Sequence, residues 1–452
     1  MTKNIIRATV PKLRQDLTLL FSVGLPLVLN NISSLTVNVA DTLMASAMGP
    51  KQLAAVALGS GVWISLFLFG LGILMAVGPS VAQLYGRGEY EEIKNHTKQS
   101  FWLALAVSFC VILVMRSFPP VFERLGIDPE VADLAQGYLN GLSYGVLGGF
   151  FYHTLKQMSE GVGETIPIMI VMLVVLPVNV FLNFCLMNGK LGVEAMGAAG
   201  CGVGSGFSLW LMFFLLFSYT RISARFKSFS FPLSYMSPDR KLLSRLFKLG
   251  LPIGLNFFLY SALFSVAALM MGTFGTDAVA AHQIVLNFSG MVFMLPLGLG
   301  MALTICVGQL VGRADLHGAI RIGFTGILLC LSMSIVSASL TLCFAEKIIA
   351  FYTKEPAISS VALSLLKFAA FFQVGDAVQT AAAFSLRGIK DTRIPMILNG
   401  FNYWVIGFGA AYFVGIRLEF GPAGIWFGIA LSLVLAGLVL VCRFYVLTKP
   451  IR

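Results

Sequence analysis

The chain has 452 residues, of which 58% are hydrophobic and only 11% charged, and its mean hydropathy is +0.87. Soluble globular proteins of this size do not have such a composition, which predicts an integral membrane protein. The apolar runs are about 20 residues long and do not alternate with period two, which favours helices over a β-barrel. The net charge of +11 comes from basic residues in short loops, not from the basic surface of a nucleic-acid-binding domain.

Twelve membrane-spanning helices are expected along the chain. Their approximate ranges are 17–46, 54–82, 98–118, 132–158, 165–188, 198–220, 246–272, 280–309, 320–344, 360–386, 394–416 and 423–446. The first apolar segment is long enough to span the bilayer and lacks a small-x-small cleavage site, so we expect it to be retained and not removed as a signal peptide.

The distribution of basic residues predicts the orientation. Of the 31 lysines and arginines, about 23 fall on the N-terminal side of the membrane and about 8 on the other side. Because basic loops remain in the cytoplasm, both termini are predicted to be cytoplasmic.

Enzyme and metal signatures are missing from the sequence. There is no Gly-x-x-x-x-Gly-Lys-Ser/Thr loop, metalloprotease helix or nucleophile elbow, so we expect neither ATP hydrolysis nor another enzymatic activity. The seven cysteines are scattered through apolar segments, which predicts core fillers and no disulfide framework or metal cluster. Any energy used would come from an ion gradient.

The chain repeats itself. A shift of 226 residues places 21–87 over 247–313 without a gap, and 21 of the 67 positions are identical. Gly24-Leu25-Pro26 then falls on Gly250-Leu251-Pro252, and Gly49 on Gly275. Six spans per half give both halves the same orientation, so we expect an N-lobe at 1–222, a basic cytoplasmic linker at 223–245 and a C-lobe at 246–452.

Asp41 lies inside the first span, where a central carboxylate costs roughly 2.5–3.5 kcal/mol and usually faces a cavity or a partner. Asn31, Ser34, Asn38 and Asp41 are three or four residues apart, so a helix aligns them in one polar stripe. Two interpretations stay open: a solvated residue near the end of the span, and a carboxylate that binds a cation or a proton.

Two amides of the fifth span, Asn179 and Asn183, follow Pro177 and are four residues apart. They are candidates to surround Asp41, or to form interhelical hydrogen bonds with a purely structural role. In the repeat Asp41 falls on Ala267. The shared architecture therefore does not require this acid, which favours a functional role.

Asp376 is the other carboxylate well inside a span, and it falls on Gly149 in the first half, where one insertion makes the shift 227 and aligns Gly388 with Gly161. Gln373 and Gln379 share its helix face. Pairing with a basic residue of a neighbouring helix is the structural alternative, but no lysine or arginine inside a span is an obvious partner.

Three polar residues of the eighth span complete the candidates. His282 is either a hydrogen-bonded structural residue or a metal ligand, and the structural role is the more frequent one for a single histidine. Gln283 and Asn287 are four apart and are predicted to line a cavity. Methionine and phenylalanine are abundant, with 19 and 38 copies, and some could line an adaptable apolar cavity.

The chain resembles the multidrug and toxic compound extrusion (MATE) family, in particular its NorM-type branch, over essentially its whole length. The resemblance is carried by Leu25-Pro26, Val39-Ala40-Asp41-Thr42-Leu43-Met44-Ala45, Pro177-Val178-Asn179, Lys248-Leu249-Gly250-Leu251-Pro252, Val279-Ala280-Ala281-His282-Gln283-Ile284, Leu286-Asn287-Phe288-Ser289 and Leu386-Arg387-Gly388-Ile389-Lys390-Asp391-Thr392-Arg393.

This resemblance implies an all-α membrane protein of two parallel six-helix lobes that form a V around a central cavity. It implies export of cationic, often aromatic drugs in exchange for protons or sodium ions, without a cofactor. A monomer surrounded by lipid in a bacterial inner membrane, with no nucleic-acid partner, is the corresponding expectation.

The resemblance also implies roles for residues. Asp41 matches the acid of the N-lobe cavity, with Asn179 and Asn183 as its partners, and Asp376 matches the acid of the C-lobe cation site. Asn38, Gln283, Asn287, Tyr260 and Gln373 are the expected lining of the substrate cavity.

One position departs from the NorM pattern. Those members carry a glutamate eight residues after the seventh-span proline, and here that position is Tyr260. A phenol stays neutral and replaces a carboxylate poorly as a cation ligand. Sodium at Asp376 or at Asp41 remains an alternative, but our hypothesis is that coupling depends on Asp41 and uses protons.

Three other functions compete with drug export. A flippase for lipid-linked saccharides shares the paired six-helix lobes but would typically place arginine or lysine in its cavity for a pyrophosphate. A channel or passive scaffold does not explain why the two halves of the repeat carry different polar residues. An embedded enzyme is not supported, because the sequence contains no catalytic motif. Carboxylates and amides in the spans favour a cationic or neutral substrate.

Overall fold

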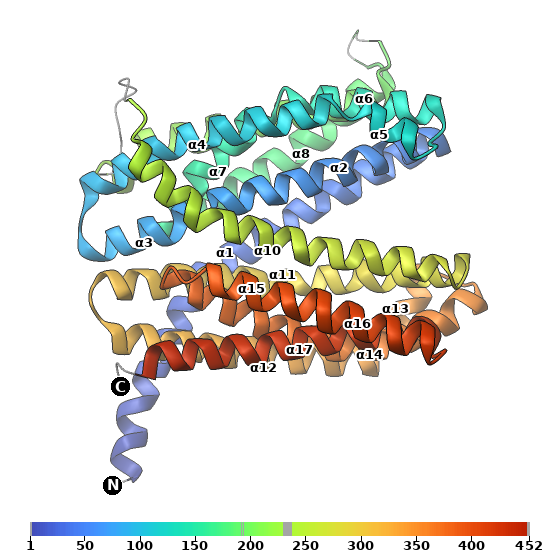
Figure 1. The fold of residues 1–452 in the computed structure, drawn as a ribbon. Coiled ribbons are helices and arrows are strands. Elements are labelled where there is room, and N and C mark those ends of the chain that lie inside the picture. The colour runs from blue at the N-terminus through green and yellow to red at the C-terminus, as the bar shows by residue number, and fades with distance from the viewer. Residues whose placement is uncertain (1, 191, 193, 229–236, 450–452) are drawn as a thin grey trace. The chain divides into compact units, whose positions relative to one another are not determined.

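The structure is a computed structural model that describes residues 2–190, 192, 194–228 and 237–449, with side chains from residue 12 onward. Figure 1 shows that helices make up the chain, and the described residues contain no strand. Ten of the helical segments are long and apolar enough to cross a membrane. The protein is therefore a multi-pass helical membrane protein, as the composition predicts.

The described residues of the N-terminal half form nine α-helices and one short 3₁₀ helix. They are α1 (Thr2–Ala47), α2 (Pro50–Leu74), α3 (Val77–Arg87), α4 (Tyr90–Arg116), α5 (Pro119–Arg124), α6 (Pro129–Ser143), α7 (Val146–Gly161), α8 (Ile166–Asn188), α9 (Gly197–Ile222) and η1 (Ala224–Phe226).

In the part of the C-terminal half that the structure describes, there are eight α-helices and two π-helical segments. They are α10 (Arg240–Gly272), α11 (Thr276–Gly312), α12 (Leu316–Cys343), α13 (Ala345–Tyr352), α14 (Pro356–Gly388), α15 (Arg393–Phe401), η2 (Asn402–Gly407), α16 (Phe408–Tyr412), η3 (Phe413–Arg417) and α17 (Gly421–Thr448).

Each of the twelve predicted spans falls on one helix or on a run of consecutive helices. Three of the spans are interrupted: 54–82 is divided between α2 and α3, 132–158 is divided between α6 and α7, and 394–416 runs through α15, η2, α16 and η3. Between α6 and α7, a methyl group added at Gly145 would overlap the backbone of Gly206 on α9. Within 394–416, the backbone of Ala411 would be overlapped by a methyl group added at Gly428 of α17. These two interruptions therefore occur where two backbones are in contact.

The chain divides into two compact units, one of residues 29–254 and one of residues 1–28 with 255–452. The two points of division are equivalent under the 226-residue repeat, since Val28 corresponds to Gly254. The predicted lobe boundaries lie elsewhere, at 222 and 246. In the structure the first part of α1 is grouped with the C-terminal helices, and the first part of α10 with the N-terminal helices.

The contacts behind this division are themselves repeated. In the 1–28/255–452 unit, a methyl group added at Gly298 of α11 would overlap the backbone of Val28. In the 29–254 unit, one added at Gly72 of α2 would overlap the backbone of Gly254. These two pairs are related by the same shift of 226, so glycine on one helix lets the crossing helix approach closely in both units.

The helices that carry the candidate site residues pack within their own units. In the 29–254 unit, α9 packs against α6, α7 and α8. In the other unit, α14 packs against α11, α12 and α17, and these helices run side by side in Figure 1. Trp426 and Tyr403 are fully buried in the core of this second unit.

Candidate functional site

Asp41 is buried in the 29–254 unit, with 7% of its surface exposed. Its Oδ1 accepts a hydrogen bond of 2.7 Å from Nδ2 of Asn183 on α8. The described residues contain no ion pair to Asp41. A buried carboxylate without a basic partner is compensated by a proton or by a bound cation.

The amides of α8 form one network, as their spacing predicts. Nδ2 of Asn183 is also 3.3 Å from Oδ1 of Asn179, and Asn179 donates to Oγ of Ser208 at 3.0 Å. Asp41, Asn183 and Asn179 are thus brought together, and the network continues onto α9. Pro177 lies inside α8, two residues before Asn179 and six before Asn183.

The part of the network on α9 was not predicted from the sequence. Ser205 Oγ lies 3.2 Å and Cys201 Sγ 3.7 Å from Nδ2 of Asn183. Gly204 lies against Asn183, because an added methyl group would overlap Oδ1 of that amide. Cys201, Ser205 and Ser208 recur at spacings of four and three, so the signal was present in a segment that is otherwise apolar.

The polar stripe on α1 is only partly involved. Asn38 is exposed, and its Nδ2 donates to the backbone oxygen of Ser34 at 3.4 Å. Ser34 in turn donates to the backbone oxygen of Asn30 at 3.0 Å. Within the predicted stripe, Asp41 is the residue whose carboxylate accepts a hydrogen bond from α8. Asn38 remains a candidate for contact with substrate.

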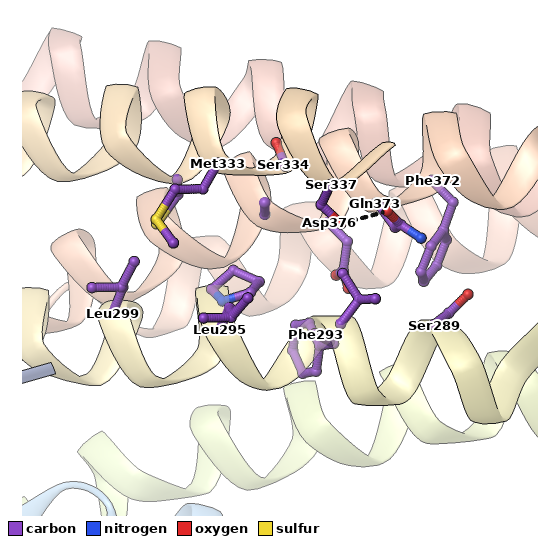
Figure 2. A pocket seen from close by; sticks show the side chains of 14 residues that line it. Ser289, Phe293, Leu295, Leu299, Met333, Ser334, Ser337, Phe372, Gln373 and Asp376 are labelled. Atoms are coloured by element: carbon purple, nitrogen blue, oxygen red, sulfur yellow. Dashed lines mark hydrogen bonds between the residues drawn. The ribbon is translucent and has the colours of Figure 1, made fainter. Parts of the chain in front are cut away.

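Asp376 is 1% exposed and lines a pocket formed by α11, α12 and α14 (Figure 2). Its carboxylate shares this pocket with Gln373, whose Oε1 accepts a hydrogen bond of 3.0 Å from Ser337, drawn as a dashed line in Figure 2. The cavity volume is about 30 Å³. That is room for one or two water molecules, whereas a drug-sized ligand occupies roughly 300 Å³ or more.

Tyr260 of α10 donates a hydrogen bond of 3.0 Å from its hydroxyl group to Oδ2 of Asp376. Its ring stacks on Phe293, with centroids 6.1 Å apart. Oδ1 of Asp376 has no hydrogen-bond partner among the described residues. The position that carries a glutamate in the NorM pattern is therefore occupied by a neutral donor that binds one of the two carboxylate oxygens.

The eighth-span candidates separate onto two faces of α11. His282 is buried, and its Nδ1 accepts a hydrogen bond of 3.1 Å from Nε1 of Trp426, in accordance with the structural alternative. Gln283 and Asn287 are exposed on another face. The hydrogen bonds found in the described residues do not connect either amide to Asp376, so both remain predictions as cavity residues.

A second ionisable cluster, absent from the sequence predictions, lies on α7. Lys156 and Glu160 are both buried, and Nζ of the lysine is 3.8 Å from Oε1 of the glutamate. Gln157 donates to the other carboxylate oxygen at 3.0 Å. Their spacing of four on a helix was the signal that could have identified this pair.

The described residues contain no group of three or more His, Cys, Asp or Glu side chains arranged to hold a metal ion. The two buried acids that the sequence predicts as coupling residues instead have amide, hydroxyl and thiol neighbours. Chemically, such surroundings suit a carboxylate that exchanges a proton, or a small cation, with an incoming organic cation.

The described residues form a multi-pass helical membrane protein with two buried carboxylates, and comparison with known proteins gives its family. The MatE family model matches residues 26–185 and 252–413, and the chain belongs to the MatE family. Multidrug resistance protein MdtK of Yersinia pseudotuberculosis serotype O:1b (strain IP 31758) is 36% identical over 435 residues, which cover 95% of each protein. MdtK of Yersinia enterocolitica serotype O:8 is 35% identical over the same length.

Solved structures share the fold. A multidrug resistance MATE family transporter of the MOP superfamily in an outward-facing conformation matches with a TM-score of 0.87 and 20% identity over 96% of both chains. The eukaryotic MATE transporter AtDTX14 matches with a TM-score of 0.86 and 18% identity, also over 96% of both chains. The family model and the MdtK relatives confirm the predicted family, and the solved structures confirm the predicted all-α fold.

Proposed function

We propose that this protein is a secondary active transporter that exports organic cations from the cell in exchange for protons. The observation that carries the proposal is the buried carboxylate of Asp41, bound by Asn183 and lacking a basic partner among the described residues. The names of its relatives, multidrug resistance protein and MATE transporter, support a spectrum of drug-like substrates.

The exchange follows from competition for one charge. The Asp41 carboxylate can be compensated by a proton or by an organic cation, and one site does not hold both. If the protonated and the substrate-bound forms favour different orientations of the membrane-embedded lobes, exchange results as a shift of populations. Alternating access of an N-lobe (1–222) and a C-lobe (246–452), joined by the linker 223–245, is part of this proposal.

Protons are favoured over sodium because of the polar neighbours of the two acids. Tyr260 donates to Asp376 where a second carboxylate would be needed, and the amide nitrogen of Asn183 donates to Asp41. Sodium prefers oxygen ligands that carry negative charge or a carbonyl dipole. A bacterial inner membrane, cytoplasmic termini and a monomeric transporter without a cofactor complete the proposal.

The test is efflux of ethidium from proteoliposomes that contain the purified protein, with a proton gradient and a sodium gradient imposed separately. The proposal predicts efflux with the proton gradient alone. Efflux that requires sodium would overturn proton coupling and assign a sodium site to Asp376 or Asp41. No gradient-driven efflux in either case would overturn cation export and favour transport of a lipid-linked saccharide.

A further inference from the structure

A surface groove in the 1–28/255–452 unit is not part of either carboxylate site. It lies between the beginning of α1 and one face of α12 and encloses about 850 Å³. Leu13 and Leu17 of α1 form one wall, and α12 contributes the other from His317 to Ser332. The groove is predominantly apolar and belongs to a region that the sequence places in the membrane.

Polarity changes along the groove. Its α12 wall begins with His317 and Arg321 and continues with Phe324, Leu328 and Leu329. From residue 317 to residue 332 the helix rises about 22 Å, whereas one leaflet of the hydrocarbon core is roughly 15 Å thick. The groove therefore has one polar end, and its apolar portion from Phe324 to Ser332 is about 12 Å long, which is most of the thickness of one leaflet.

Arg321 is held in place at the polar end by a buried acid. Its Nε and Nη2 donate to the two carboxylate oxygens of Asp16 at 2.7 and 3.1 Å. The Asp16 side chain is 7% exposed and that of Arg321 is 40% exposed. The Nη1 donors have no protein partner in the described part of the chain, so the acid presents an oriented guanidinium group at the surface of the groove.

The charges around this end favour an anion. Lys12 and Arg14 are exposed on either side of Leu13, and Arg313 is exposed just before α12. The nearby acids are already hydrogen-bonded, Asp16 to Arg321 and Asp315 to the backbone nitrogen of Gly318 at 2.8 Å. The basic residues at this end thus outnumber the acids, and the acids are occupied.

We propose that this groove binds one anionic phospholipid, with its phosphate group at Arg321 and an acyl chain along Phe324 and Leu328. A guanidinium group matches phosphate oxygens in geometry as well as charge. Basic pockets between membrane helices are suited to anionic lipid headgroups. The lipid connects the part of α1 before Val28 to α12 beside the Asp16–Arg321 ion pair. Binding at this groove is independent of the proposed transport function.

The test is retention of lipid by the full-length transporter, purified from vesicles of phosphatidylglycerol or of phosphatidylcholine and analysed by native mass spectrometry. Leu328→Trp fills the groove from its exposed edge, since Leu328 is 65% exposed. Val336→Trp is the matched control, because Val336 lies on the same helix outside the groove and is 60% exposed. We expect Leu328→Trp to retain about tenfold less phosphatidylglycerol than Val336→Trp.

A second pair of variants tests the headgroup. Asp16→Asn with Arg321→Gln removes the ion pair without leaving a buried charge unpaired. Asp391→Asn with Arg443→Gln is its control, since that pair is joined at 3.0 Å in the same unit. Loss of phosphatidylglycerol in the first double variant alone supports the proposal. Equal retention in all variants, or equal retention of the two lipids by the unaltered protein, would overturn it.

Discussion

Nδ2 of Asn183 lies 2.7 Å from Oδ1 of Asp41, although 142 residues separate them in the sequence. The contact joins α1 to α8 and places a neutral donor on a buried carboxylate that has no basic partner among the described residues. Because the donor is neutral, the net charge of the site still depends on whether Asp41 carries a proton. An arginine or lysine in place of Asn183 would have fixed that charge and left no role for a proton.

Gly204→Ala should displace the side chain of Asn183 and so disrupt its hydrogen bond to Asp41. An added methyl group would overlap Oδ1 of Asn183, so the amide would have to move away from Asp41. Hydrogen bonds to charged groups contribute about 1.5–3 kcal/mol, and we therefore expect ethidium efflux to fall by about tenfold or more. The control is Gly61→Ala, because no atom lies within 4 Å of a methyl group added there. Efflux that is equal in the two variants would contradict a role for this geometry.

Tyr260→Phe should leave transport largely intact. The ring would keep its contacts with Phe264 and Phe293, and the loss of one hydrogen bond to Asp376 should change proton-driven efflux by no more than about threefold. A loss as complete as that caused by Asp41→Asn would show that coupling depends on the Asp376 site instead.

Tyr260→Glu should create sodium dependence. A second carboxylate beside Asp376 would supply the anionic oxygen ligands that a metal cation requires. We expect efflux by this variant to be stimulated by an inward sodium gradient, with Tyr260→Gln as the neutral control. If sodium has the same effect on both variants, the tyrosine is not what excludes a sodium site.

Lys156 and Glu160 should depend on each other for stability. Removing one partner of a buried ion pair leaves an uncompensated charge and costs about 3–5 kcal/mol. Lys156→Met and Glu160→Gln should therefore each lower the thermal stability of the detergent-purified protein, whereas the double variant should recover most of the loss. Losses that simply add in the double variant would show that the two groups act independently.

The repeat predicts a stabilising substitution at Ala314, which follows α11 with a φ of 58°. Its equivalent after α3 is Gly88, with a φ of 75°. An alanine in the left-handed conformation destabilises the folded state by roughly 1–2 kcal/mol. Glycine removes this strain, but its greater flexibility in the unfolded chain offsets part of the gain. Ala314→Gly should raise the melting temperature and Gly88→Ala should lower it. An unchanged or lower melting temperature for Ala314→Gly would contradict this interpretation.

Local sequence patterns were sufficient to predict the helices and the α8 part of the Asp41 network, but not the part on α9. Hydropathy gives the twelve spans, and spacings of three and four place Asn179 and Asn183 on one face, where the structure joins them to Asp41. The 226-residue repeat is also visible in the structure, where Gly49 and Gly275 both precede a helix with φ values of 113° and 98°.

Contacts that depend on tertiary packing could not be predicted. The ion pair between Asp16 and Arg321 spans 305 residues, and no local pattern indicates which helices will meet. The sequence does not predict the hydrogen bond from Tyr260 to Asp376, because it indicates the tyrosine only as a lost carboxylate and as a lining residue of the substrate cavity. The division of the units at Val28 and Gly254 reflects helix crossings, whereas the predicted boundaries followed the polar linker.

The most direct test of the central claim is a count of protons released when ethidium binds to the purified transporter in weakly buffered detergent solution. If a proton and an organic cation compete for Asp41, binding should release about one proton per ethidium in the unaltered protein and in Tyr260→Phe, and none in Asp41→Asn. Undiminished proton release from Asp41→Asn, or none from the unaltered protein at a pH where it transports ethidium, would contradict the claim that Asp41 couples the two fluxes.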